Sequence, residues 1–207
     1  MTTTQTRIGI DFSISSPAIS IINDNTQTIT SICLRPKPNS DVNKLVLDKQ
    51  HINIMGNTYK HNIVLLDNIT SYNSNEERYY NISNTLMTEL IKHIDKDNEL
   101  KINIENYGYA TTGLVFNIAE CTSVFKQMLW FNLGISPNYH LNLIAPSTVK
   151  KMFTGKGNAN KMVMYETFCG LSTVDIYDCF YNIGKMNTKN IPSPISDIID
   201  SIVIALC

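Results

Sequence analysis

Three short segments rich in β-branched residues open the chain, and they constrain its fold more than any other feature. Residues 7–12, 17–23 and 28–34 each have the length and composition of a strand. Asp24-Asn25 separates the second segment from the third and suits a hairpin turn. We therefore predict that the chain begins with an antiparallel meander of three strands.

Helical and strand-like patterns alternate after this meander. The predicted strands are residues 100–105, which end on Glu105, and 141–145. The predicted helices are 76–95, 113–133, a segment that begins at Pro146, 158–170, and a segment from Ser193-Pro194 toward Cys207. This order predicts an α/β fold with a mixed central sheet, three antiparallel strands followed by two parallel ones, and helices on both faces.

Residues 35–75 lack a clear pattern. Arg-Pro-Lys-Pro at 35–38 interrupts regular structure, a strand is conceivable at 60–66, and residues 70–75 are polar. With 207 residues, the chain has the length of one domain. We expect a single domain over 1–207 that carries an insertion or an extra hairpin at about 35–75.

The charge balance argues mildly against a nucleic-acid binder, because the net charge is −1. Local clustering matters more than the sum, and four lysines fall within twelve residues at 150–161 with no acidic residue among them. The five cysteines are scattered without a CxxC pair, which indicates free thiols in a reducing, cytoplasmic compartment. No signal-peptide stretch or run of roughly 18 apolar residues is present, so no membrane association is expected.

The placement of four carboxylates is the most informative chemical feature. Asp11 and Glu105 each end an apolar strand, and burial there is costly unless the carboxylate binds a cation or a donor. Asp197 and Asp200 are three residues apart, which places them on one face of the last helix. Each residue alone is more often a turn or capping residue. Four together would repel strongly unless Mg²⁺ or Mn²⁺ bound between them, and two such ions suit in-line displacement at phosphorus.

The lysine cluster lies in the segment from Ala145 to Lys161, which also contains Gly155 and Gly157. Loop amides and lysines suit a phosphate backbone, although a solvated lysine face with a helix-ending glycine is the simpler reading. The segment is not a nucleotide-binding P-loop, because Asn160 replaces its second glycine and Met162 its Ser or Thr. No nucleotide cofactor is therefore expected.

Four blocks of the chain resemble RuvC-type Holliday junction resolvases, especially the shorter versions of bacteriophages and large DNA viruses. The third block is the most specific, with a proline, then Val-Lys, then Thr-Gly-x-Gly-x-Ala-x-Lys. The blocks are Gly9–Ser13, Ile104–Tyr107 with the helix that follows it, Pro146–Lys161 and Ser193–Asp200. The resemblance implies an RNase H-like fold, a homodimer, and metal-dependent paired nicking of four-way junctions.

The resemblance also assigns roles to individual residues. The metal ligands would be Asp11, Glu105 and Asp200, with Asp197 in the fourth position, and Lys161 would complete the catalytic set. The expected DNA contacts are Ser13, Tyr107, Tyr109, Lys150, Lys151, Lys156, Asn160 and Lys161. The family's aromatic wedge position is occupied here by Gly108, so a tyrosine beside it would have to stack on a base.

The expected function is cleavage of Holliday junctions or other branched DNA by two-metal hydrolysis. The alternatives are a related RNase H-like nuclease for flaps or RNA–DNA hybrids, and a non-catalytic junction-binding protein. An actin-like ATPase is disfavoured, because that fold needs two domains and 207 residues are too few. A dimer interface is expected on the helix 113–133, through Phe116, Val124, Met128 and Trp130.

Overall fold

A computed structural model describes residues 5–35, 43–44, 50–69, 71–95, 98–106, 114–134, 141–173, 175–181, 183 and 191–207. The strands are β1 (Gln5–Asp11), β2 (Ala18–Asn23), β3 (Thr28–Leu34), β4 (Asn43–Lys44), β5 (His51–Ile54), β6 (Asn57–Leu66), β7 (Glu99–Glu105), β8 (Leu141–Ile144) and β9 (Phe180–Tyr181). The helices are α1 (Asn75–Lys92), α2 (Leu114–Leu133), α3 (Pro146–Thr154), α4 (Lys161–Cys169), a 3-10 turn (Ile176–Cys179) and α5 (Ile195–Leu206).

Seven of these strands form one mixed sheet in the order β5-β6-β3-β2-β1-β7-β8. β1, β2 and β3 are antiparallel neighbours, and β7 and β8 continue the sheet parallel to β1. The predicted meander, the two parallel strands and the α/β class are therefore confirmed. The segment 35–75 adds two strands to this sheet, because β5 and β6 pair as a hairpin and β6 lies parallel to β3. A third strand of the segment, β4, pairs with β9 in a separate two-stranded sheet.

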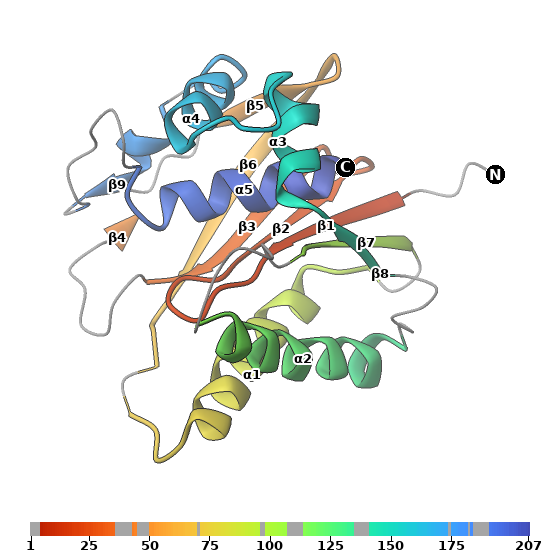
Figure 1. Cartoon of the computed structure of the whole chain (residues 1–207). Coiled ribbons are helices and arrows are strands. Elements are labelled where there is room, and N and C mark those ends of the chain that lie inside the picture. Colours follow the sequence, from red (N-terminus) through yellow and green to blue (C-terminus); the bar gives the residue numbers. More distant parts are fainter. Residues whose placement is uncertain are drawn as a thin grey trace.

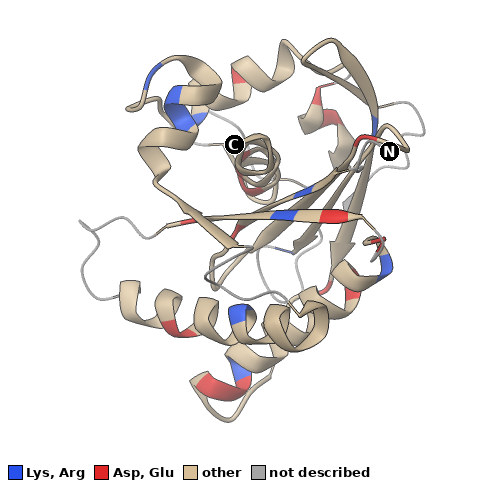
Figure 2. Ribbon diagram, turned by 90° about the vertical axis from the view of Figure 1, so that its right-hand side faces the viewer, with Lys and Arg blue, Asp and Glu red and all other residues tan. Residues whose placement is uncertain are grey.

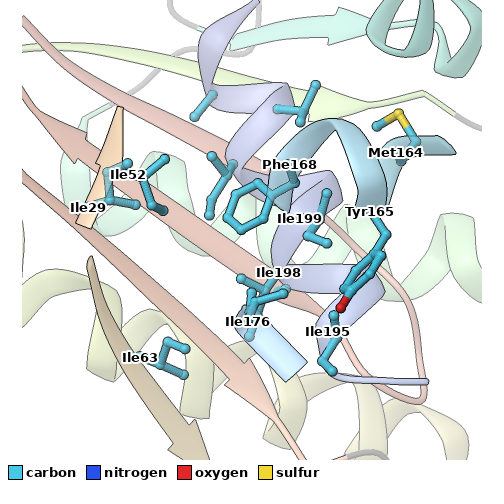
Figure 3. Close-up of a cluster of buried hydrophobic side chains, with 14 of the residues drawn as sticks. Ile29, Ile52, Ile63, Met164, Tyr165, Phe168, Ile176, Ile195, Ile198 and Ile199 are labelled. Atoms are coloured by element: carbon cyan, nitrogen blue, oxygen red, sulfur yellow. The ribbon is translucent and has the colours of Figure 1, made fainter. Parts of the chain in front are cut away.

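Helices cover both faces of the sheet (Figure 1). α1 and α2 bury one face around Ile8, Ile10 and Phe125, whereas α5 lies on the other face with α3 and α4 above it. Figure 3 shows Phe168 of α4 beside Ile199 of α5, and Tyr165 of α4 beside Ile195, in this second core. The start of α4 differs in detail from expectation. The helix predicted at 158–170 begins at Lys161, because the Asn160 side chain caps it by accepting from the Val163 amide.

Helix α5 lies directly on β1, at Gly9. A Cβ atom added there would be 2.1 Å from the Ser201 carbonyl oxygen and 2.2 Å from the Ala205 nitrogen. Only glycine permits this approach of helix to strand.

Buried polar contacts hold α5 in register along the sheet. Asn103 Nδ2 donates to the Ile204 carbonyl and Lys101 Nζ to the Cys207 carbonyl. Ser201 is also linked to β2 through a 2.7 Å hydrogen bond between its hydroxyl and that of Ser20.

All five cysteines are free thiols. Among the described residues, no helix combines the length and apolar character that crossing a membrane requires.

Candidate metal centre

A cavity of about 300 Å³ opens where β1, β7, α3, α4 and α5 meet. It combines acidic and basic side chains with a small apolar wall. The lining residues are Asp11, Ser13, Glu105, Pro146, Val149, Lys150, Lys161, Met164, Asp197 and Asp200.

Two neighbouring parallel strands bring the first two carboxylates to this cavity. Ile10 of β1 is paired with Ile104 of β7, so Asp11 and Glu105 follow at the same edge of the sheet. Side chains alternate between the faces of a strand. Ile10 and Ile104 pack toward α1 and α2. Asp11 and Glu105, the next residue of each strand, therefore face α5. The Asn103 contact with α5 supports this assignment of faces.

Helix α5 brings the second pair of carboxylates. Asp197 lies in its first turn and Asp200 follows one turn later, so both are on the face that meets the strand ends. The glycine contact at Gly9 sets how closely this face approaches β1. The convergence expected from the spacing of these four carboxylates is thus observed.

Asp11, Glu105 and Asp200 resist ionisation in this position. Burial raises the pKa of Asp11 well above its ordinary value, and the charges of the other three carboxylates raise it further. Burial together with the neighbouring carboxylates raises the pKa of Asp200 to about 7. Burial likewise raises the pKa of Glu105, against the opposing effect of two lysine ammonium groups. Removing such charges from water and placing them together is unfavourable without a compensating cation.

The donor set fits a hard divalent cation. Oxygen ligands of this kind suit Mg²⁺ or Mn²⁺. Within the described residues, the side chains of Asp11, Glu105 and Asp200 form no hydrogen bond or ion pair, and Asp197 Oδ2 is buried without a partner. No three acidic, histidine or cysteine side chains of the described ranges already stand together as a closed metal cluster. The cavity therefore supplies ligands that a cation would have to draw together.

This electrostatic arrangement predicts a pH-dependent stability of the metal-free chain. A carboxylate with a raised pKa in the folded state destabilises it increasingly as pH rises above the ordinary value near 4. We expect Asp11→Asn to raise the melting temperature at pH 8 by a few degrees, because the neutral amide removes a buried charge that the folded state disfavours. The difference should shrink toward pH 4, where the raised pKa keeps the wild-type Asp11 carboxyl protonated in the folded state. Thermal unfolding in the presence of a chelator measures both, and equal melting temperatures at pH 8 would contradict the raised pKa.

Two lysines belong to the same cavity. Lys150 lies on α3, whose first residue is Pro146, and Lys161 is the first residue of α4. Gly155 ends α3 in the left-handed conformation at φ 77°, so the helix-ending reading of this glycine is correct. The loop that begins at Gly155 leads directly to the capped start of α4. Lys161 therefore lies beside the carboxylates of the cavity.

The structure brings together most of the residues predicted from the sequence. Asp11, Ser13, Glu105, Lys150, Lys161, Asp197 and Asp200 all line the cavity. Three predicted DNA contacts, Lys151, Lys156 and Asn160, are exposed and lie outside its lining. Tyr107 and Tyr109 lie outside the described residues.

Four residues at the cavity were not among the predicted site residues, namely Pro146, Val149, Met164 and Ser196. Met164 is three residues after Lys161, and helical spacing could have identified it. Ser196 borders a small recess beside the cavity, and no pattern in the sequence points to it.

Comparisons with known proteins identify the fold. No protein-family model and no curated protein matches the chain. The Thermus thermophilus RuvC structure matches with a TM-score of 0.52 at 13% identity, covering 96% of this chain and 92% of that one. T. thermophilus RuvC in complex with a Holliday junction substrate matches with a TM-score of 0.53 at 14% identity, covering 97% and 90%.

The yeast mitochondrial Holliday junction resolvase Ydc2 matches with a TM-score of 0.48 at 15% identity, covering 99% of this chain and 76% of that one. The two RuvC matches establish that the chain has the RuvC, RNase H-like fold, as predicted. At 13–14% identity they establish the fold alone.

Proposed function

We propose that this chain is a metal-dependent endonuclease that hydrolyses phosphodiester bonds in branched DNA, above all in four-way junctions. The observation that carries the proposal is the single cavity in which four carboxylates from β1, β7 and α5 meet lysines from α3 and α4. The fold supports it, because the similar T. thermophilus RuvC was solved in complex with a Holliday junction substrate. Membership of a phage or viral branch stays a prediction from the sequence blocks.

The four carboxylates, Asp11, Glu105, Asp197 and Asp200, would hold two Mg²⁺ ions, for which Mn²⁺ could substitute. Bound ions of this kind activate a water and stabilise the leaving oxygen of a phosphodiester. The chain's own lysines supply further positive charge. Lys150 and Lys161 reach the same cavity, where their ammonium groups would hold the oxygens of the scissile phosphate.

The DNA backbone would continue over the surface beside the cavity. Lys151 and Lys156 are exposed on α3 and in the loop that follows it. Figure 2 shows lysine positions in the helical layer that contains α3 and α4, and other basic positions on the sheet and on the helices of the opposite face. Such exposed lysines contribute sequence-independent, salt-sensitive affinity. Asn160 acts first as the cap of α4, because its side-chain oxygen accepts from Val163.

Lys161 and Lys156 should separate catalysis from binding. We expect Lys161→Ala to slow single-turnover cleavage by roughly 100-fold while the junction Kd changes little, because Lys161 lines the cavity. Lys156→Ala is the matched control, since it should weaken binding and reduce the salt slope by about 1 without slowing the bound complex. If weaker junction binding and a lower salt slope fully explained the slower cleavage by Lys161→Ala, Lys161 would be a contact to the DNA backbone and not a catalytic group.

A homodimer follows from the proposed reaction, because two symmetric cuts need two sites that face opposite strands. The predicted interface helix, α2, exposes Phe116 and Trp130 to solvent. Phe131 is also exposed, and its ring stacks on that of Trp130 with 5.8 Å between centroids. Val124 and Met128 differ from the other two predicted contacts, since they are half-buried against the chain's own core. Light scattering should give a dimer, and Phe131→Glu should reduce it to monomers that no longer make paired nicks.

The deciding experiment is a nicking assay on a synthetic four-way junction with Mg²⁺ and with Mn²⁺. A flap, an RNA–DNA hybrid and a linear duplex of the same sequence serve as competing substrates. Preferred cutting of the junction supports the proposal. Preferred cutting of the flap or hybrid would favour a related RNase H-like nuclease, and binding without any metal-dependent cutting would favour a non-catalytic junction-binding protein.

A further inference from the structure

The hydroxyl of Ser196 bridges Lys161 and Asp197. Lys161 Nζ donates to Ser196 Oγ over 3.2 Å, and Ser196 Oγ donates to Asp197 Oδ1 over 3.3 Å. A serine hydroxyl has one hydrogen to donate and two lone pairs to accept with, so both contacts can exist together. They form a continuous chain from the ammonium group on α4 to the carboxylate on α5.

This bridge is shielded from water on the carboxylate side. Ser196 is 4% exposed and Asp197 is 7% exposed. A small recess bordered by Lys161, Ser196 and Asp200 joins the bridge to the acidic residues. Hydrogen bonds are stronger in such a low-dielectric setting than at the surface.

The two oxygens of Asp197 differ as a result. Oδ1 accepts from Ser196, whereas Oδ2 is buried and has no hydrogen-bond partner in the described part of the chain. A carboxylate held at one oxygen has a defined orientation, and its other oxygen is left for a ligand. The intervening hydroxyl also keeps the Lys161 ammonium one group away from Asp197, so the two do not pair directly and neutralise the carboxylate.

We propose that Ser196 is a positioning residue, which orients Asp197 Oδ2 toward a divalent cation and holds the Lys161 ammonium beside that cation. The inference rests on the proposed metal-dependent function and deepens it. Hydrogen-bond partners of metal ligands commonly contribute 10–100-fold to metal affinity or activity. Ser196 fits this role, since it contacts both a predicted ligand and a predicted catalytic lysine.

The test measures Mn²⁺ affinity by isothermal titration calorimetry of the full chain without DNA. We expect Ser196→Ala to weaken Mn²⁺ binding by about 10-fold. Ser196→Thr and Ser196→Val form an isosteric pair, and the threonine variant alone should keep the affinity within about three-fold of wild type. This pair keeps the test decisive if the alanine variant folds poorly, because the two side chains differ only in the hydroxyl.

Ser201→Ala is the matched control, because Ser201 is also fully buried on α5 but lines neither the cavity nor the recess. It should keep Mn²⁺ affinity, although it loses the hydrogen bond to Ser20. A second readout is single-turnover cleavage at saturating Mn²⁺. Ser196→Ala should remain slow there with an unchanged junction Kd, since Lys161 has lost its anchor.

The outcomes separate this inference from the proposed function. If the wild-type chain binds Mn²⁺ and the valine variant binds it equally well, the role of Ser196 is overturned and the proposed function stands. If Ser201→Ala loses as much affinity as Ser196→Ala, the effect reflects a loosened helix and the inference is also overturned. A wild-type chain that binds no Mn²⁺ overturns the proposed function first, and the role of Ser196 with it.

Discussion

Asp11→Asn and Glu105→Gln are each expected to abolish junction cleavage while junction binding stays within about three-fold of wild type. Both residues end central strands at one edge of the sheet and line the same cavity. Each substitution removes one negative charge from the proposed metal ligands and leaves the exposed lysines unchanged. We expect the cleavage rate to fall at least ~10³-fold, which corresponds to about 4 kcal/mol of transition-state stabilisation.

Single-turnover nicking of a labelled four-way junction, with binding measured in Ca²⁺ or a chelator, separates the two effects. Glu99→Gln is the matched control, because Glu99 is an exposed acid at the opposite end of the same strand, β7. It should cut at the wild-type rate. Retained cleavage in Asp11→Asn or Glu105→Gln would remove that residue from the metal site, and loss of binding would show that the substitution disturbed the DNA surface.

Gly9→Ala is expected to have the largest effect on stability. The added methyl group would meet the backbone of α5 at 2.1–2.2 Å, and a backbone cannot move aside as a flexible side chain can. The helix would have to shift as a whole, against the hydrogen bonds that hold Asn103 to Ile204 and Ser20 to Ser201. Overpacking typically costs 1–3 kcal/mol, and we expect about 3 kcal/mol here, or roughly 6–12 °C in melting temperature.

The same substitution should also impair the site, because α5 carries Asp197 and Asp200. Thermal unfolding and Mn²⁺ titration of Gly9→Ala measure the two consequences separately. Gly170→Ala is the control, since Gly170 has helical backbone angles and an added Cβ would meet nothing closer than 3.4 Å. A Gly9→Ala protein with unchanged stability would contradict the close approach of α5 to β1.

Much of the site followed from local pattern. Strand alternation places Gly9 and Asp11 on one face of β1 and Ile8 and Ile10 on the other. The same alternation in β7 places Glu105 on the face that meets α5. Spacing alone placed Asp197 with Asp200 on one side of a helix. These features depend on neighbours within a few residues, and the sequence displays them directly.

Other features depended on contacts between distant segments. The hairpin β5–β6 adds to the edge of the meander with β6 parallel to β3, and β5 also exchanges backbone hydrogen bonds with residues 171–173. No periodicity in 35–75 could have indicated that β6 pairs with β3 or that β5 bonds to residues 171–173. Pairing across a sheet depends on which strand edge the rest of the fold leaves open. Ser196 became a site residue only because the start of α4 lies beside the start of α5.

The sequence by itself determined the strand order of the opening meander, the face of each carboxylate on its own element, and the lysine segment before α4. These follow from side-chain period and backbone preference, which act over one or two turns of chain. Only the tertiary structure decided that α5 approaches β1 at Gly9 and that one hydroxyl bridges Lys161 to Asp197. Such contacts form when close packing brings separate elements within a few ångströms of each other. The distance between two elements depends on how all the side chains of the core pack together, and no local segment of the sequence shows it.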